Sequence, residues 1–380
     1  MIILRSVRIR TATTLVCAGL LTAACGSSPT DTANTNSGGV TGSATGLDAV
    51  YAAVSGLTGD ARYEKLLSLA KQEGGLVSFY HSGNMKTENA AFTKKTGIKV
   101  IDFQATAERV AERVAQENKA GRVGSDVLLG DGGQFEATGG IAKLQGPALD
   151  ESKYKMTNLV SPIGIMMVPT FNANLVKSSE VPKSWKDYFT TFNKPKAIEL
   201  TDWPWFYTVV HYLMDKNGMT QQAAIDMFTS GIKGAFTVDG HTLLAQLLAS
   251  GQYAYVPNLY GQYYPQLKGK GAPLSEDGVT ADLPPTLTAL YIGLTEGAKH
   301  SAAGLLYLEW MMSADGQQAV ANAGYVPPAS TYTGPETLLQ KYPYALFDKT
   351  PSLSDADRST WQKLFDTALR KAGTKQVGNS

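Results

Sequence analysis

Hydrophobic positions between residues 60 and 130 follow two alternating periods. Apolar residues recur every three to four positions in three segments, which predicts helices at 60–73, 87–95 and 107–120. Short apolar runs lie between them and predict strands at 76–80, 98–103 and 126–129. Because single helices separate these strands, we expect right-handed crossovers, a largely parallel sheet and an α/β fold.

The second half of the chain continues this mixture of periods. Apolar runs predict strands at 197–200, 253–256 and 288–294. Helical spacing of apolar residues predicts helices at 207–214, 221–228, 243–249, 302–312, 336–340 and 355–371. We find no internal repeat.

The N-terminus has the pattern of an export signal. Arg5, Arg8 and Arg10 precede a short apolar stretch, and the sequence Leu-Thr-Ala-Ala-Cys ends at Cys25. This ending resembles a bacterial lipobox, which implies cleavage before Cys25 and lipid attachment to its thiol. We therefore expect a signal peptide at 1–24 and, in the Ser-, Thr- and Gly-rich segment 25–46, a lipidated flexible tether. The alternative is an ordinary cleavable signal followed by a coincidental cysteine.

Charge and composition exclude several classes of protein. The 380 residues include 34 Lys and Arg against 33 Asp and Glu, a formal net charge of +1. Loss of the signal peptide would change it to about −2, so we expect no nucleic-acid binding through bulk positive charge. Mean hydropathy is −0.14, and no apolar run of bilayer length follows the N-terminus. A chain of this length favours two lobes over one core.

Polar residues follow the first predicted strands at their carboxyl ends, where α/β sheets bind ligands. His81, Ser82 and Gly83 follow the strand at 76–80 directly, Thr106 follows the next one, and Asp131 follows the third. We take all five as candidate ligand-binding residues. Ser82, Thr106 and Asp131 have an alternative role as turn or helix-capping residues.

Aromatic residues gather in two loops of the second half. Trp203, Trp205 and Tyr207 lie around Pro204, which we expect to stiffen a turn after the strand at 197–200. A second group, Tyr260, Tyr263 and Tyr264, follows the strand at 253–256. Tyrosine and tryptophan combine apolar area with a polar group, so they suit ligand clefts, although packing alone also explains part of the set.

Several stretches together resemble the extracellular solute-binding proteins (family 1) of bacterial ABC importers, and most closely the ferric-ion-binding subgroup. They are LVSFYHSG with AFTKKTGIKV, QENKAG with SDVLLGD, SEVPKSWKDYF, SGQYAYVPNLYGQYYPQLKGKGAPL, and EWMMSADGQQAVANAGYVPP. The resemblance covers about residues 60–329.

This resemblance implies a type II periplasmic-binding-protein-like fold, with two hinge-linked α/β lobes and a central cleft. Crossover strands are expected near Ser161 to Thr170 and Asp282 to Thr288. The first lobe would hold 47–164 plus 286–330, and the second would hold 165–285 plus 331–380 with the C-terminal helices. Ligand contacts from both lobes would select the closed state.

The function that follows is a receptor that captures a small ligand between its lobes and delivers it to an ABC permease in the membrane. We expect an extracytoplasmic monomer that is lipid-anchored to the cell membrane. The ligand is expected to be a small organic molecule or an anion, and a cation over the aromatic rings fits the same residues.

Ferric ion is an alternative ligand. Ferric binders that this chain resembles use an adjacent tyrosine pair as phenolates, together with a histidine and an acid or anion. Here a possible Fe³⁺ set is His81, Tyr260, Tyr263 and Tyr264. Leu259 stands where the first tyrosine of the pair would fall, and the true pair lies further along the loop.

Two other classes remain open. An enzyme would need a catalytic constellation, and the chain has no GxSxG, HExxH or P-loop motif, so we expect no enzymatic activity. A non-transport surface lipoprotein that reuses the fold would need an exposed apolar patch outside the cleft.

Overall fold

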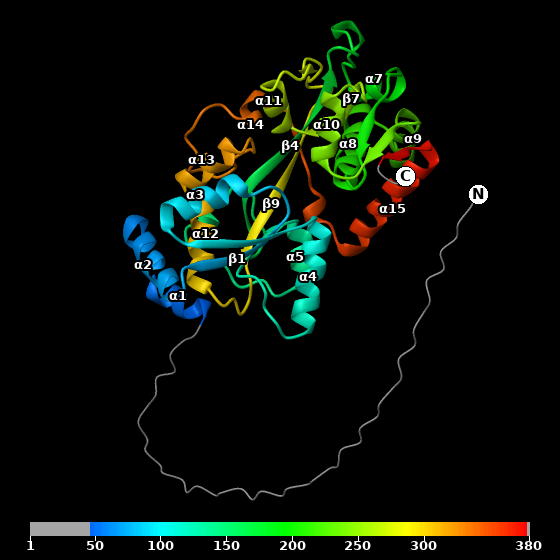
Figure 1. The fold of residues 1–380 in the computed structure, drawn as a ribbon. Helices are drawn as coiled ribbons and strands as arrows, with labels where there is room; N and C mark the ends of the chain where they lie inside the picture. The colour runs from blue at the N-terminus through cyan, green and yellow to red at the C-terminus, as the bar shows by residue number, and fades with distance from the viewer. Residues whose placement is uncertain (1–45, 378–380) are drawn as a thin grey trace, which may run out of the picture. The chain divides into compact units, whose positions relative to one another are not determined.

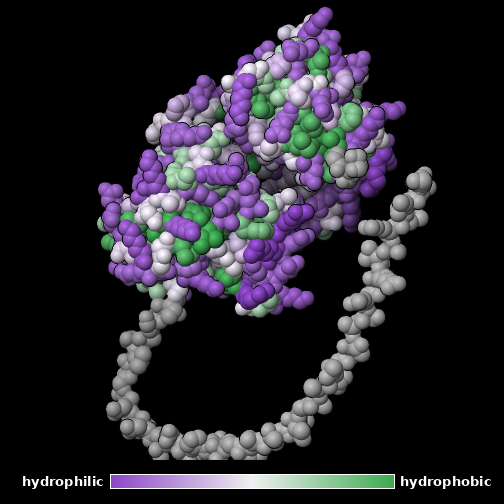
Figure 2. Space-filling view, in the orientation of Figure 1, coloured by the Kyte–Doolittle hydropathy of each residue, from purple (hydrophilic) through white to green (hydrophobic). Residues whose placement is uncertain are grey.

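The computed structural model describes residues 46–377 (Figure 1). The predicted signal peptide, Cys25 and nearly all of the tether lie outside the described residues. Within residues 46–377, no helix combines the length and apolar character that crossing a membrane requires. Figure 2 shows hydrophilic residues over most of the visible face, broken by smaller hydrophobic areas.

Helices and strands alternate through the described residues. The strands are β1 (Leu76–His81), β2 (Lys99–Gln104), β3 (Val127–Gly130), β4 (Val160–Asn172), β5 (Ala197–Glu199), β6 (Phe236–Val238), β7 (Tyr255–Tyr260), β8 (Leu274–Ser275), β9 (Thr286–Leu294), β10 (Leu346–Phe347) and β11 (Lys375–Val377). The α-helices up to β5 are α1 (Leu47–Ala53), α2 (Gly59–Gln72), α3 (Lys86–Thr96), α4 (Ala107–Lys119), α5 (Gly132–Thr138), α6 (Ala148–Glu151) and α7 (Trp185–Thr190). Those after β5 are α8 (Trp203–Asn217), α9 (Gln221–Gly231), α10 (His241–Ala249), α11 (Tyr263–Lys268), α12 (Ser301–Met312), α13 (Ala314–Asn322), α14 (Leu338–Lys341) and α15 (Asp355–Ala372).

The larger sheet is mixed. Its strand order is β2-β1-β3-β9-β4-β7, with β10 paired to β9 and β8 paired to β4. The pairs β1–β2 and β1–β3 are parallel, as predicted for strands joined by single helices. The expectation of a largely parallel sheet is wrong for β4, β7 and β9, which pair antiparallel. A second sheet, β11-β6-β5, is parallel throughout.

Strands β4 and β9 connect separate parts of the hydrophobic core. Their register runs from Val160 opposite Ile292 to Met167 opposite Thr286. All 13 residues of β4 are buried, and successive segments of the strand enter different hydrophobic clusters. Ile163 and Ile165 pack with α2 and α12 residues, whereas Phe171 packs with residues of α7, α8 and α15.

We name these two clusters core A and core B. Core A combines residues between Val50 and Ile165 with residues between Leu290 and Ala329, and core B runs from Met167 to Ala372 without any residue between Leu290 and Ala329. Contacts do not divide the described residues into smaller compact units. The predicted lobe boundaries therefore stay a prediction.

The segment around Pro204 forms the first turn of a helix and not the loop turn that we expected. Helix α8 begins at Trp203, and Pro204 occupies its first turn. A proline is favourable there, because the first amides of a helix have no intrahelical acceptor and the fixed backbone angle already suits the helix.

The C-terminal segment is tied to the crossover strand β9 by a buried acid. The hydroxyl of Thr288 donates to Asp348 Oδ2 at 3.2 Å, and the Thr350 amide donates to Asp348 Oδ1 at 2.8 Å. Burial raises the pKa of Asp348 to about 6. The folded protein therefore binds this proton more tightly than the unfolded chain, so stability from this group falls as pH rises from about 4 to about 6.

Asparagine has nearly the shape of aspartate but carries no charge, so Asp348→Asn removes the cost of burying a carboxylate. We expect Asp348→Asn to gain stability relative to wild type as pH rises from 4.5 to 7, by about 2 kcal/mol. Urea unfolding at both pH values measures the difference. A difference that is the same at both pH values would contradict the assignment.

Candidate functional site

Three segments of the second half converge at the ends of strands β5, β6 and β7. Glu199 ends β5, and its carboxylate accepts hydrogen bonds from the Gly240 amide at 3.1 Å and the Thr201 hydroxyl at 2.9 Å. One buried carboxylate thus ties the loop before α8 to the loop before α10. Burial, followed by the neighbouring Asp202 carboxylate, raises the pKa of Glu199 to about 7.

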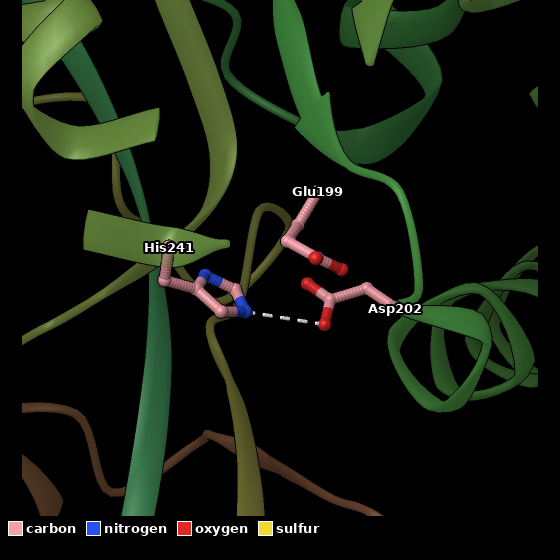
Figure 3. A group of neighbouring side chains, drawn as sticks. All are labelled: Glu199, Asp202 and His241. Carbon is pink, nitrogen blue, oxygen red and sulfur yellow. Dashed lines mark hydrogen bonds and ion pairs between the residues drawn. The ribbon is translucent and has the colours of Figure 1, made fainter. Parts of the chain in front are cut away.

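Asp202 joins the third segment to the other two. Its Oδ2 accepts from Asn258 Nδ2 at 2.5 Å, and its Oδ1 lies 3.2 Å from His241 Nε2. Figure 3 shows the side chains of Glu199, Asp202 and His241 pointing toward one another from separate segments. Their ligand atoms all lie within 4.8 Å of one another. We call Glu199, Asp202, His241 and Asn258 the carboxylate cluster.

Tyr260 lies on top of this cluster. Its ring stacks on the His241 imidazole with 3.4 Å between centroids, and the Tyr263 ring lies nearly parallel at 6.5 Å. The Tyr263 hydroxyl is 2.8 Å from that of Thr242. Burial, followed by the carboxylates of Asp202 and Glu199, raises the pKa of Tyr260 well above its usual value. The Tyr260 phenol therefore lies near two acidic side chains, Asp202 and Glu199.

Tyr260 also lies between the two cores, since it packs against residues of core A and of core B. Tyr325 belongs to core A, and its phenol adds to the rise in the pKa of Tyr260. The Asn84 amide donates to the Tyr325 hydroxyl at 3.2 Å. Gly83, with φ of +95°, lets the loop after β1 turn here, and a Cβ on it would meet the Tyr325 hydroxyl at 3.7 Å.

Tyr325 further lines a cavity beside this junction. The cavity measures about 310 Å³, and its walls include Gly261 and Lys341. Burial raises the pKa of Tyr325 to about 12, so its hydroxyl stays protonated at neutral pH. The structure thus brings the loop after β1, Tyr325 and the end of β7 to one junction between core A and core B.

Other predicted residues of the first half are engaged elsewhere. His81 is 1% exposed, and its ring lies between Asp102 Oδ2 and the Gly83 carbonyl, 3.2 Å from each. Burial lowers its pKa, which favours a neutral imidazole. Ser82 is buried, with its amide bonded to the Leu129 carbonyl. Thr106 caps α4 by accepting from the Arg109 amide.

Asp131 combines its capping role with a contact to the C-terminal helix. Its carboxylate accepts from the Gln134 amide at 3.1 Å and pairs with Arg358 Nη2 at 2.7 Å. The Arg358 guanidinium also lies over the Trp203 ring, 5.3 Å from its centroid. Asp131 and Trp203, both predicted as ligand residues, are thus joined through an arginine of α15.

The remaining aromatic candidates divide between core and surface. Trp205 is 1% exposed and belongs to core B, which gives it a packing role. Tyr207 borders a cavity of about 550 Å³ between α8 and β10, with His211 and Lys349 also in its walls. Lys268 donates to the Tyr264 hydroxyl at 2.7 Å. Three of the four residues of the ferric set therefore have different hydrogen-bond partners: His81 pairs with Asp102, Tyr263 with Thr242 and Tyr264 with Lys268.

Several residues of the site were not predicted from the sequence. Asp202 follows the predicted strand at 197–200, so the strand-end rule applied to the first half would have found it. His241 follows β6, a strand that the sequence pattern did not predict. Tyr325 lies in the GYVPP stretch that carried the resemblance. Arg358 lies 227 residues from Asp131 and has no local signal.

Comparisons with known proteins support the α/β fold. A family model described as bacterial extracellular solute-binding protein matches residues 89–346. No curated protein sequence matches this chain. Among solved structures, iron-bound HitA from Pseudomonas aeruginosa has a TM-score of 0.60 at 17% identity, covering 78% of this chain and 98% of that one.

Two further structures resemble the chain to the same extent. The Atu4243-GABA receptor has a TM-score of 0.65 at 18% identity, covering 77% of this chain and 97% of that one. A periplasmic thiamin binding protein has a TM-score of 0.62 at 18% identity, covering 77% and 96%. At these identities the likeness shows the two-lobed α/β fold of periplasmic binding proteins and leaves the ligand open.

The pair formed by Asp131 and Arg358 gives a stability prediction. The two side chains are 18% and 6% exposed. Arg358→Met leaves the Asp131 carboxylate without its cation, so we expect a loss of about 3 kcal/mol in the free energy of unfolding. Adding Asp131→Asn should recover part of that loss.

Chemical unfolding of both variants measures these changes. Arg113→Met serves as the control, because its pair with Glu117 is more exposed and should contribute less than about 1 kcal/mol. Equal instability of the single and double variants would show that the charge pair is not the cause.

Proposed function

Because the chain belongs to the family of bacterial extracellular solute-binding proteins, we propose that it is the receptor of an ABC importer and captures one small ligand at the junction around Tyr260. Family members bind solutes and work with a membrane permease, and this role needs no catalytic group. The proposal rests on one observation above all. Tyr260 packs against both hydrophobic cores, and its ring stacks on His241 of the carboxylate cluster.

The ligand that best suits this junction is a small organic molecule. The rings of Tyr260 and Tyr263 offer apolar faces, and no hydrogen bond of the described residues engages the Tyr260 hydroxyl. Asp202 and Glu199 lie close enough to raise the pKa of that phenol, so the junction disfavours an anionic group beside Tyr260. Structural neighbours include an iron-bound protein, a GABA receptor and a thiamin binding protein, so the fold alone does not select among ligands.

Ferric ion is the alternative ligand, and Tyr260 is one of the residues proposed to coordinate it. Ferric coordination by tyrosine requires phenolates, whereas burial and two carboxylates stabilise the protonated form of Tyr260. The hydroxyls of Tyr263 and Tyr264 point to different partners, Thr242 and Lys268. These contacts favour the organic ligand.

Other parts of the proposal concern location and partners. We propose that the lipid on Cys25 holds the receptor at the outer face of the cell membrane as a monomer, next to its permease. A surface lipoprotein without transport would need an apolar docking patch. The large hydrophobic side chains that are exposed among the described residues lie on three separate segments, at Ile101, Leu175 and Leu243.

Removing one hydroxyl tests the ligand site. A native mass spectrum of the purified full chain identifies the molecule that it carries from the host. We expect Tyr260→Phe to weaken binding of that molecule at least tenfold, about 1.4 kcal/mol, because its hydroxyl is the one available to a ligand. Tyr264→Phe removes a hydroxyl that is bonded to Lys268 and should leave the affinity unchanged.

Calorimetric titration of both variants gives the affinities. Equal affinity of Tyr260→Phe and wild type would reject the site. A visible absorption band on addition of ferric ion, lost in Tyr260→Phe, would support iron as the ligand instead.

Replacing the proposed lipid attachment residue tests the anchor. We expect Cys25→Ser to carry no lipid and to keep residues 1–24, because the lipobox that implies both cleavage and lipid attachment ends in this cysteine. Mass spectrometry of the wild-type protein and of the variant reports the N-terminus and the attached lipid of each. A wild-type protein without lipid on Cys25 would contradict lipid anchoring at this residue.

A further inference from the structure

The carboxylate cluster holds two buried acids with little positive charge to balance them. Glu199 is 3% exposed and Asp202 is 6% exposed. Within the described part of the chain, no lysine or arginine forms an ion pair with either carboxylate, and the imidazole of His241 is the only basic group paired with Asp202. Two adjacent buried carboxylates need a cation or a shared proton to be stable.

Two polar atoms beside these acids have no hydrogen-bond partner. Asn258 is fully buried, and its Oδ1 lacks a donor although its Nδ2 contacts Asp202. His241 Nδ1 is also buried without a partner. Rotating the Asn258 amide by half a turn exchanges its oxygen and nitrogen, and places the oxygen next to Asp202. That orientation is repulsive unless a cation lies between the two oxygens.

We propose that Glu199, Asp202, His241 and Asn258 form a binding site for one divalent transition-metal cation. The donor set is two carboxylates, one imidazole and one amide oxygen, which come from β5, the residue before α8, α10 and β7. Carboxylates and an imidazole together suit Mn²⁺ or Zn²⁺ better than Mg²⁺, which retains its waters, or Ca²⁺, which takes oxygen ligands. This site differs from the tyrosine and His81 set considered for ferric ion.

The cation would act on the ligand site through Tyr260. The His241 ring supports that of Tyr260 by stacking, so fixing His241 also fixes the tyrosine. The cluster further joins the loops before α8 and α10 to β7. We expect the metal to brace these loops and to tighten ligand binding. Only this coupling rests on the proposed function, because the metal site stands on the cluster alone.

Titration with metal tests the site directly. The full chain, purified in detergent and freed of metal with EDTA, is titrated with Mn²⁺ and with Zn²⁺, and calorimetry and thermal unfolding are recorded. We expect binding of one ion per chain and a higher unfolding temperature with at least one of the two metals. Glu199→Gln and Asp202→Asn should each weaken that binding at least tenfold.

Glu88→Gln is the matched control. Glu88 is a fully buried glutamate whose pKa is also raised by burial to about 7, but it lies in α3 outside the cluster. This variant should bind the metal like wild type. Asn258→Asp guards against loss of folding in the other variants, since it adds a carboxylate to the cluster. It should be less stable than wild type without metal and should gain more stability from it.

The outcomes separate the alternatives. Absence of binding to wild type, or wild-type affinity in both Glu199→Gln and Asp202→Asn, would overturn the metal site and leave a shared proton as the stabilising feature. Affinity for the ligand identified by mass spectrometry is measured separately in EDTA. A receptor that binds this ligand but no metal would reject the metal site while retaining the proposed function.

Discussion

The antiparallel pairing of β4 with β9 is the constraint on which the rest of the structure depends. β4 runs from core A into core B, whereas β9 contributes Leu290, Ile292 and Leu294 to core A, so the register between the strands fixes where β4 leaves core A for core B. Gly164 of β4 also contacts the segment after α13. It exchanges two backbone hydrogen bonds with Val326, at 2.7 and 2.9 Å. A Cβ there would lie 3.1 Å from that of Val326, so only glycine admits the approach without displacement.

The position of Tyr260 follows from the same strand. Met167 of β4 pairs with Tyr260 of β7, and the Gly261 amide donates to the Met166 carbonyl at 2.8 Å. A shift of β4 by one residue would turn every side chain of the strand to the opposite face. The tyrosine, the carboxylate cluster beneath it and the loop at Gly83 would then no longer meet. The ligand site is therefore a consequence of strand register as much as of its own residues.

Local periodicity predicted most of the helices and strands, because their apolar spacing is set by the element itself. The predicted helix at 107–120 is α4 at Ala107–Lys119, and the predicted strand at 76–80 is β1 at Leu76–His81. Strand direction was not predictable in this way. β9 returns between β3 and β4 from more than a hundred residues away, and its antiparallel pairing depends on contacts that no local window contains.

The candidate site was predictable where strand ends alone decide it. Gly83, Tyr260 and Tyr263 lie at or just after such ends, β1 at Leu76–His81 and β7 at Tyr255–Tyr260, and their role in binding a ligand stays a prediction. His81 is the last residue of β1, but its side chain turns toward Asp102 on the neighbouring strand, and a pattern of single positions does not give that direction. The pairs of Asp202 with His241 and of Asp131 with Arg358 bridge 39 and 227 residues, so they depend on the completed fold.

The same alternation of side chains explains why the tyrosine pair of ferric binders has no equivalent here. Strand β7 continues through Tyr260, so Leu259 and Tyr260 point to opposite faces of the sheet. Leu259 is fully buried in a hydrophobic cluster with Val256 and Leu274, whereas Tyr260 lies between cores A and B. A tyrosine at 259 would direct its hydroxyl into an apolar core. The backbone of β7, and not only the identity of one residue, therefore lets only one of these two adjacent positions direct a phenol toward this junction.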